Sequence, residues 1–91
     1  QMKIKQMALS DTYVRTAEIL LKLAQEHGLE KEGVIELKLQ LSRQDLANMI
    51  GTARETVSRA LSQFKKEGSI DIDGKKIIIK NKDKLQAWID N

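Results

Sequence analysis

The residues with the most informative chemistry lie in the stretch GTARETVSRAL, residues 51–61. Here Arg54 and Arg59 lie close to a glutamate, Glu55, and to a small hydroxyl residue, Ser58. An arginine can donate two parallel hydrogen bonds to O6 and N7 of guanine, and a glutamate can accept one from N4 of cytosine. These residue types therefore suit the reading of base edges, although two arginines on a helix are just as typical of a solvated surface.

The spacing brings these residues together if residues 53–67 form a helix, the recognition helix, that starts from Thr52. At about 100° per residue, one side of this helix is apolar and carries Ala53, Val57, Ala60, Leu61 and Phe64. The opposite side carries Arg54, Glu55, Ser58, Arg59 and Ser62. A helix that only binds phosphates gains nothing from an acid on its contact face, so Glu55 favours base reading. The alternative is that Glu55 completes a capping box with Thr52, and both roles are open to it in turn.

A strand and a shorter helix are predicted directly before this one. Residues 34–41, VIELKLQL, alternate apolar and polar side chains along most of their length, which predicts a half-buried strand. Ser42 is the expected N-cap of a helix over residues 43–50, with Asp45 in the capping-box position. Gly51 is expected to end that helix, so the two helices form a helix-turn-helix with a short first and a long second member.

A helix is also predicted near the start of the chain. It is expected to begin at Asp11 or Thr12 and to end before Gly28. Its apolar stripe consists of Val14, Ala17, Leu20, Leu21 and Ala24. Ile19 and Leu23 lie on a second face, which predicts a helix that is covered on two sides.

The C-terminal part of the sequence predicts a hairpin and a last helix. Ile70 and Ile72 alternate with acids, Asp73 and Gly74 are a favoured turn pair, and residues 77–79 form a β-branched run. Asn81 or Asp83 is the expected cap of a helix that carries Leu85, Trp88 and Ile89. The predicted fold is therefore mainly α with a small antiparallel β component, a winged helix-turn-helix.

Composition excludes several classes of protein. The 91 residues suffice for one small domain, and the absence of cysteine excludes disulfides and thiolate metal sites. No apolar run approaches the ~20 residues of a membrane span, so we expect a cytoplasmic protein without a membrane partner. The carboxylates are scattered and no nucleophile lies near a base, so we expect neither catalysis nor a cofactor or metal in this chain. Residues 42–80 hold eight Lys/Arg and five Asp/Glu, which places the net charge of +3 around the helix-turn-helix.

The sequence LSRQDLANMIGTARETVSRALSQFKKEGSIDIDGKKIII, residues 41–79, resembles the C-terminal winged-helix domain of the Crp–Fnr family of bacterial transcription regulators. The part of this resemblance that is specific to the family is the pattern SRQDLA, IG, RETVSR and L. Upstream of it, LSDTYVRTAEILLKLA is more loosely similar to the family's first helix after its hinge. The resemblance implies that residues 1–10 are the end of a dimerisation helix and hinge, and that residues 11–91 are the DNA-binding domain. The family's N-terminal effector domain is expected to belong to a longer protein of which this chain is a fragment.

The resemblance also implies roles for single residues. The positions implied to read bases are Arg54, Glu55, Ser58 and Arg59. The positions implied to contact phosphates are Ser42, Arg43, Gln44, Thr56 and Lys75. Full-length members bind as two-fold dimers to inverted repeats. Arg54 favours half-sites like TGTGA, whereas Ser58 is shared with members that read the TTGAT type.

Two further partner hypotheses remain. RNA polymerase is a candidate partner in the family, through the loop around residues 26–33. The alternative to DNA binding is a winged helix that serves as a protein-interaction or dimerisation module, with Ile4, Met7, Ile19 and Leu23 as its contact surface. Salt-sensitive binding to a DNA duplex separates the two, because only phosphate contacts release counterions.

Overall fold

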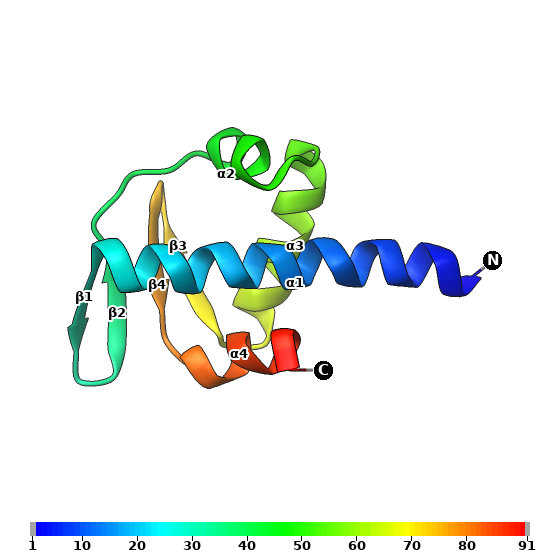
Figure 1. Cartoon of the computed structure of the whole chain (residues 1–91). Coiled ribbons are helices and arrows are strands. Elements are labelled where there is room, and N and C mark those ends of the chain that lie inside the picture. Colours follow the sequence, from blue (N-terminus) through cyan, green and yellow to red (C-terminus); the bar gives the residue numbers. More distant parts are fainter. Residues whose placement is uncertain (1, 91) are drawn as a thin grey trace.

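A long N-terminal helix packs against the sheet and against the three shorter helices (Figure 1). The computed structural model describes the backbone of residues 2–90 and the side chains of residues 11–90. Within these residues the elements are, in chain order, α1 (Met2–His27), β1 (Gly28–Lys31), β2 (Val34–Leu37), α2 (Arg43–Ile50), α3 (Arg54–Lys66), β3 (Ile70–Asp73), β4 (Lys76–Ile79) and α4 (Lys82–Asp90). The predicted class, mainly α with a small antiparallel sheet in a winged helix-turn-helix, is confirmed.

The four strands form one antiparallel sheet in the order β1-β2-β4-β3. The predicted hairpin of β3 and β4 is confirmed, with Ile70 opposite Ile79. Ile35 of β2 pairs with the same Ile79 from the other side, so β4 lies between β2 and β3. Alternate side chains of β2 and β4 are buried, as expected for a sheet with one face on the core.

Two features of the sheet differ from the sequence prediction. β1 was not predicted, because all four of its side chains are exposed and it shows no alternation of apolar and polar residues. The strand expected over residues 34–41 ends at Leu37. Leu39 and Leu41 still pack against the core from the irregular segment that follows. The alternation of apolar and polar residues beyond Leu37 therefore reflects the burial of Leu39 and Leu41 and does not indicate a paired strand.

The expected helix start at Asp11 or Thr12 is wrong, since α1 runs without a break from Met2 to His27. The hydroxyl of Thr16 donates a hydrogen bond to the Thr12 carbonyl one turn earlier. No glycine or proline interrupts this part of the helix, so residues that can cap a helix are tolerated within it. The predicted end before Gly28 is confirmed, and a Cβ there would overlap the Ala24 carbonyl oxygen and the Ile35 side chain.

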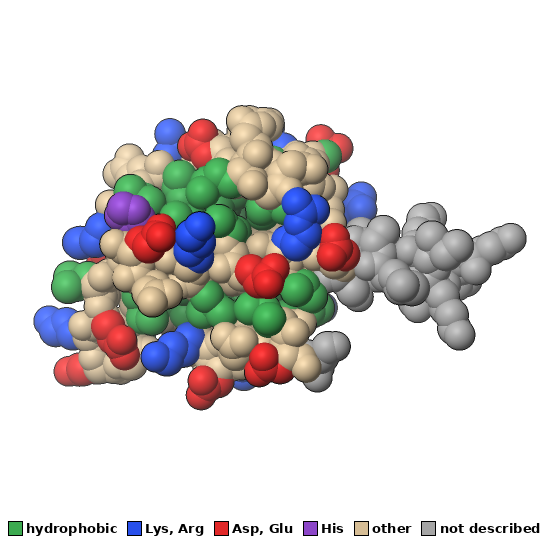
Figure 2. Space-filling view, in the orientation of Figure 1, with side chains coloured by type: hydrophobic (Ala, Val, Ile, Leu, Met, Phe, Trp, Pro, Cys, Tyr) green, Lys and Arg blue, Asp and Glu red, His purple; other side chains and the backbone are tan. Residues whose placement is uncertain are grey.

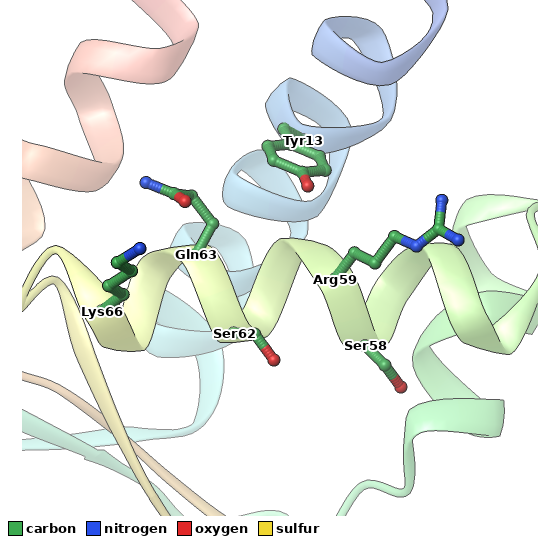
Figure 3. A pocket seen from close by; sticks show the side chains of 6 residues that line it. All are labelled: Tyr13, Ser58, Arg59, Ser62, Gln63 and Lys66. Atoms are coloured by element: carbon green, nitrogen blue, oxygen red, sulfur yellow. The ribbon is translucent and has the colours of Figure 1, made fainter.

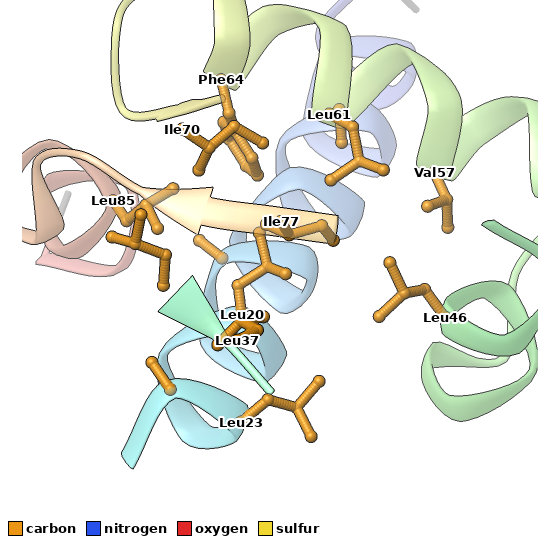
Figure 4. Close-up of a cluster of buried hydrophobic side chains, with 14 of the residues drawn as sticks. Leu20, Leu23, Leu37, Leu46, Val57, Leu61, Phe64, Ile70, Ile77 and Leu85 are labelled. Carbon is orange, nitrogen blue, oxygen red and sulfur yellow. The ribbon is translucent and has the colours of Figure 1, made fainter. Parts of the chain in front are cut away.

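The hydrophobic core lies where α1, the helix-turn-helix and the sheet meet (Figure 4). Its largest fully buried apolar side chains are Phe64, Leu20, Leu46, Leu61, Ile70, Ile79, Leu85 and Val57. Leu23 also belongs to this core with 4% of its surface exposed, and Ile19 packs against it. The burial of Leu23 agrees with the prediction of a helix covered on two sides, but it contradicts the alternative hypothesis at this residue, because a buried side chain cannot serve as a contact surface for a partner. The side chains of Ile4 and Met7 lie outside the described residues.

Three aromatic rings fasten α1, α3 and α4 to one another. The Tyr13 ring meets Phe64 edge-on at a centroid distance of 6.2 Å and Trp88 at 5.4 Å. The indole N–H of Trp88 donates to both carboxylate oxygens of Glu67 at 3.2 and 3.0 Å. Asn81 is the side-chain cap of α4, since its Oδ1 accepts a hydrogen bond from the Lys84 N–H at 3.2 Å. These contacts hold the C-terminal end of α3 between two other helices.

Candidate nucleic-acid interface

α3 separates its apolar and polar residues as the helical spacing predicted, except that Ala53, expected on the apolar side, is exposed at the N-cap. Val57, Ala60, Leu61 and Phe64 are buried against the rest of the domain. On the other side Arg54, Glu55 and Arg59 are exposed, and Ser58 is half-buried between them. The structure therefore gathers the four residues expected to read bases on one open side of one helix.

The predicted capping box at the start of α3 is absent. The N-cap is Ala53, with extended backbone angles and no side-chain hydrogen bond, and the helix begins at Arg54. Thr52 was expected at this position, but its backbone N–H donates to the Ala47 carbonyl at 3.0 Å. It thus belongs to the end of α2, where Gly51 has a φ of +82° and also donates to Ala47. Thr52 therefore closes the previous helix, and Ala53 takes the N-cap position of α3 that was expected for Thr52.

The absence of that capping box leaves the Glu55 side chain exposed. Among the described residues, its carboxylate makes neither a hydrogen bond nor an ion pair. The sequence left two roles open for Glu55, base reading and a capping box with Thr52. The structure lacks the capping box.

α2 begins with the predicted capping box. The Ser42 N–H donates to Asp45 Oδ2 at 2.9 Å, and the Asp45 N–H donates to Ser42 Oγ at 3.0 Å. The bond from the Ser42 N–H, a further side-chain bond from Ser42, and the charge of Lys75 hold the pKa of Asp45 below its usual range. Arg43 and Gln44 are exposed on the first turn of the same helix.

Four of the five residues that the resemblance assigned to phosphate contacts line one hollow of about 360 Å³. Its lining consists of Leu41, Ser42, Arg43, Gln44, Arg54, Gly74 and Lys75. These residues come from the start of α2, the start of α3 and the β3–β4 turn. We call this the α2–wing hollow. Thr56 is half-buried on α3 and does not line it.

Lys75 lies at the tip of the β3–β4 hairpin. The turn was expected at Asp73 and Gly74, but Asp73 pairs with Lys76 in the ladder, so the turn residues are Gly74 and Lys75. Gly74 has a φ of +65°, which is typical of the first central position of a two-residue hairpin turn. The shift by one residue moves Lys75 out of the strand and into the turn, beside the start of α2.

A second hollow, of about 370 Å³, lies further along α3, toward its C-terminal end. It is lined by Tyr13, Ser58, Arg59, Ser62, Gln63 and Lys66 (Figure 3). We call it the α1–α3 hollow. Tyr13 was not predicted as a neighbour of this face, because it lies far away along the chain and no local pattern relates it to α3.

The face of the molecule on the α1 side differs from these hollows. Lys and Arg side chains there alternate with Asp and Glu, and hydrophobic side chains lie between them (Figure 2).

On the sheet, Glu36 forms ion pairs with Lys76 at 3.3 Å and Lys38 at 3.6 Å. These two cations hold the pKa of Glu36 below its usual range, chiefly through a hydrogen bond from Lys76.

Two other kinds of feature are absent from the described residues. No group of three or more His, Cys, Asp or Glu side chains lies close enough together there to hold a metal ion. None of the helices in that part of the chain has the length and apolar character needed to cross a membrane.

Comparison with known proteins identifies relatives of this domain. The sequence family described as Crp-like helix-turn-helix domain matches residues 14–88. The CRP-like cAMP-activated global transcriptional regulator of Mycobacterium tuberculosis is 33% identical over 79 residues, which are 87% of this chain and 35% of the relative. The anaerobic regulatory protein of Bacillus subtilis is 34% identical over 91 residues, covering 99% of this chain and 38% of the relative.

A solved structure agrees with these sequence relatives. The CO-dependent transcription factor CooA from Carboxydothermus hydrogenoformans superposes with a TM-score of 0.83 at 33% sequence identity. The match covers 94% of this chain and 40% of CooA. The chain thus spans less than half the length of the regulators that it matches.

Proposed function

The chain belongs to the family of Crp-like helix-turn-helix domains, the DNA-binding domains of Crp/Fnr-type transcription regulators, and we propose that it reads a specific DNA sequence with α3 in the major groove. The observation that carries this proposal is the α2–wing hollow. Arg54, at the start of the base-reading face, lines it together with Arg43 and Lys75. A duplex that places its bases against α3 can therefore place a phosphate against these cations.

Base reading is assigned to the exposed residues of α3. Arg54 lies in the first turn, where it can donate two hydrogen bonds to guanine, and Arg59 lies little more than one turn deeper. Glu55 is exposed and can accept a hydrogen bond from N4 of cytosine. Ser58 is small and lets the helix lie close to the base edges. This set of residues favours a half-site like TGTGA.

Phosphate binding is assigned to residues around the α2–wing hollow and to Thr56 on α3. The Ser42 hydroxyl is bonded to both the N–H and the carboxylate of Asp45, and it lies at the edge of the hollow, where it can turn its proton from that carboxylate to a phosphate. Arg43, Gln44 and Lys75 are exposed and can donate to neighbouring phosphate oxygens. These contacts position the domain on the duplex and carry no sequence information themselves.

We propose that the whole protein binds as a two-fold dimer on an inverted repeat. Two recognition helices of a dimer read half-sites about 34–36 Å apart, and the second half-site adds affinity through effective concentration. Residues 1–10 are proposed to be the end of the dimerisation helix, and residues 11–91 the DNA-binding domain. The domain alone is therefore expected to bind a half-site weakly. Because bacterial DNA lies in the cytoplasm, we expect the protein there.

RNA polymerase is the proposed partner of the β1–β2 hairpin. Leu29 and Val34 on this hairpin are exposed by 55% and 37%, although both are large apolar residues. Leu29 lies on the edge strand β1 and Val34 on the neighbouring β2, and large apolar side chains exposed at the edge of a sheet are typical of surfaces that other proteins contact. The substitution Leu29→Ser should lower transcription activation by the whole protein and leave its DNA affinity unchanged. A loss of both together would contradict a polymerase contact.

The proposed function is tested by selecting binding sites for this chain from a pool of random duplexes. We expect enrichment of a half-site like TGTGA, and a dissociation constant that rises steeply with salt because bound phosphates release counterions. The variant Lys75→Ala should weaken selected and random duplexes about equally and reduce the salt slope by about 1. The proposal fails if the chain binds no duplex in a salt-dependent way.

A further inference from the structure

Glu55 is the one acidic residue among the four that are proposed to read bases. Arg54 and Arg59 can only donate hydrogen bonds, and the hydroxyl of Ser58 can donate or accept, whereas a carboxylate can only accept. In the major groove, only the amino groups at N4 of cytosine and N6 of adenine donate. Glu55 is therefore restricted to a base that presents one of these amino groups.

The fold holds Glu55 on the open side of α3. At about 100° per residue, it lies between Arg54 and Arg59 around the helix axis. The opposite side of α3 is anchored in the core by Val57 and Leu61, which are 0% and 2% exposed. A helix packed in this way cannot rotate to move one side chain away from the base edges.

No group of the described chain competes with a base for the Glu55 carboxylate. The N-cap of α3 is Ala53, which makes no side-chain hydrogen bond. Arg59 follows four residues after Glu55, but the ion pairs of the described residues do not include one between them. The exposed carboxylate is solvated in the free domain, and it loses part of this water when α3 enters the groove. A carboxylate that loses water without gaining a donor costs free energy.

A paired cytosine carries two hydrogens on N4. One bonds to O6 of the guanine in the pair, and the other points into the major groove. A single methyl group on N4 fits the intact pair only in place of the second hydrogen, which is the one that Glu55 can accept. On the basis of the proposed function, we propose that Glu55 makes DNA binding by this domain sensitive to methylation at N4 of the cytosine that it contacts. A methyltransferase acting on this amino group would thereby release the regulator from its site.

The first test compares methylated duplexes. Each cytosine of the selected half-site is replaced in turn by N4-methylcytosine, and each adenine by N6-methyladenine. At the cytosine that Glu55 contacts, we expect the dissociation constant to rise about tenfold or more, because the carboxylate loses its donor and stays desolvated. The matched control is 5-methylcytosine at the same position, which adds a methyl group to the same groove and keeps the N4 hydrogen. It should have a much smaller effect.

The second test connects the effect with Glu55. The variant Glu55→Ala removes the acceptor, so it should bind the unmodified and the N4-methylated duplex about equally. Glu26→Ala is the matched control, because Glu26 is an exposed glutamate of α1 outside the helix-turn-helix. This control should keep the full sensitivity of wild type. Thermal unfolding of both variants checks that they are folded.

The outcomes separate this inference from the proposed function. If wild type binds the selected duplex and N4-methylation of no cytosine weakens binding, the inference is wrong and the proposed function stands. The inference is also wrong if Glu55→Ala keeps the sensitivity of wild type, because the methyl group then acts by its bulk. Weakening by N6-methyladenine alone would overturn the assignment to cytosine. If the chain binds no duplex in a salt-dependent way, the proposed function fails and the inference fails with it.

Discussion

α2 and α3 begin with nearly the same backbone and opposite side-chain chemistry. The two N-cap residues, Ser42 and Ala53, have φ values of −76° and −78° and ψ values of 164° and 148°. Ser42 forms a complete capping box with Asp45, whereas Ala53 has no side chain that can accept a hydrogen bond. The backbone geometry of a helix start is therefore set independently of whether its free N–H groups are satisfied.

The difference indicates what each helix start is for. An uncapped start costs about 1 kcal/mol compared with a capped one, and it leaves N–H groups and the positive end of the helix dipole open to an anion. α3 tolerates this cost because Val57, Leu61 and Phe64 anchor it in the core. The first turn of α3 is available to a ligand, while the first turn of α2 is fixed by the protein itself.

The largest expected effect concerns the first residue of each helix. Arg54→Ala, at the start of α3, should cost about 1–3 kcal/mol on the selected duplex and relax discrimination at one base pair. Arg43→Ala, at the start of α2, is the matched variant and should weaken selected and random duplexes alike. Titrations of both variants against both duplexes measure this contrast. Equal losses on both duplexes for Arg54→Ala would remove its base-reading role.

A smaller effect is expected on the stability of the fold. Ser42→Ala removes the capping box of α2 and should lower the free energy of unfolding by about 0.5–2 kcal/mol. Thr52→Ala, just before α3, should change it by less than about 0.5 kcal/mol, because Thr52 caps no helix. Urea denaturation of the two variants gives both values. A larger loss for Thr52→Ala than for Ser42→Ala would reverse the comparison.

A cap can also be added where the protein lacks one. Ala53 already has the extended backbone angles of an N-cap, so Ala53→Ser should stabilise the fold by about 0.5–1 kcal/mol. The new hydroxyl would occupy an N–H group of the first turn of α3. Chemical denaturation measures the gain, and unchanged stability would indicate that the start of α3 is satisfied in another way.

The smallest effect is a dependence on pH. The hydrogen bonds from Ser42 lower the pKa of Asp45 in the folded state, so this contribution to stability is present above the unfolded pKa of about 4 and is lost as the pH falls through the folded value. The difference in unfolding midpoint between wild type and Asp45→Asn should therefore be largest near neutral pH and shrink below about pH 4. A difference that stays constant down to pH 2 would exclude a role for the ionised carboxylate.

Much of the site could be predicted from local patterns. The two faces of α3 follow from the spacing of Val57 and Leu61 against Arg54 and Ser58, because a helix fixes the direction of each side chain. The capping box at Ser42 is likewise a matter of residues three positions apart. β1 could not be predicted, since none of its side chains is buried and burial is what produces a pattern.

The sequence by itself determined the helix-turn-helix, the hairpin and the residues on the open side of α3, because each depends on neighbours within a few turns or one hairpin. Only the tertiary structure decided that Thr52 closes α2 instead of capping α3, that Leu23 is buried, and that Lys75 lies beside Arg43 and Arg54. It also placed Tyr13 next to α3. The burial of Leu23 and the positions of Lys75 and Tyr13 depend on how distant elements pack, and packing joins side chains that no spacing along the chain relates. The place of Thr52 depends on a local backbone bond to Ala47, which competes with the cap that the sequence pattern predicted.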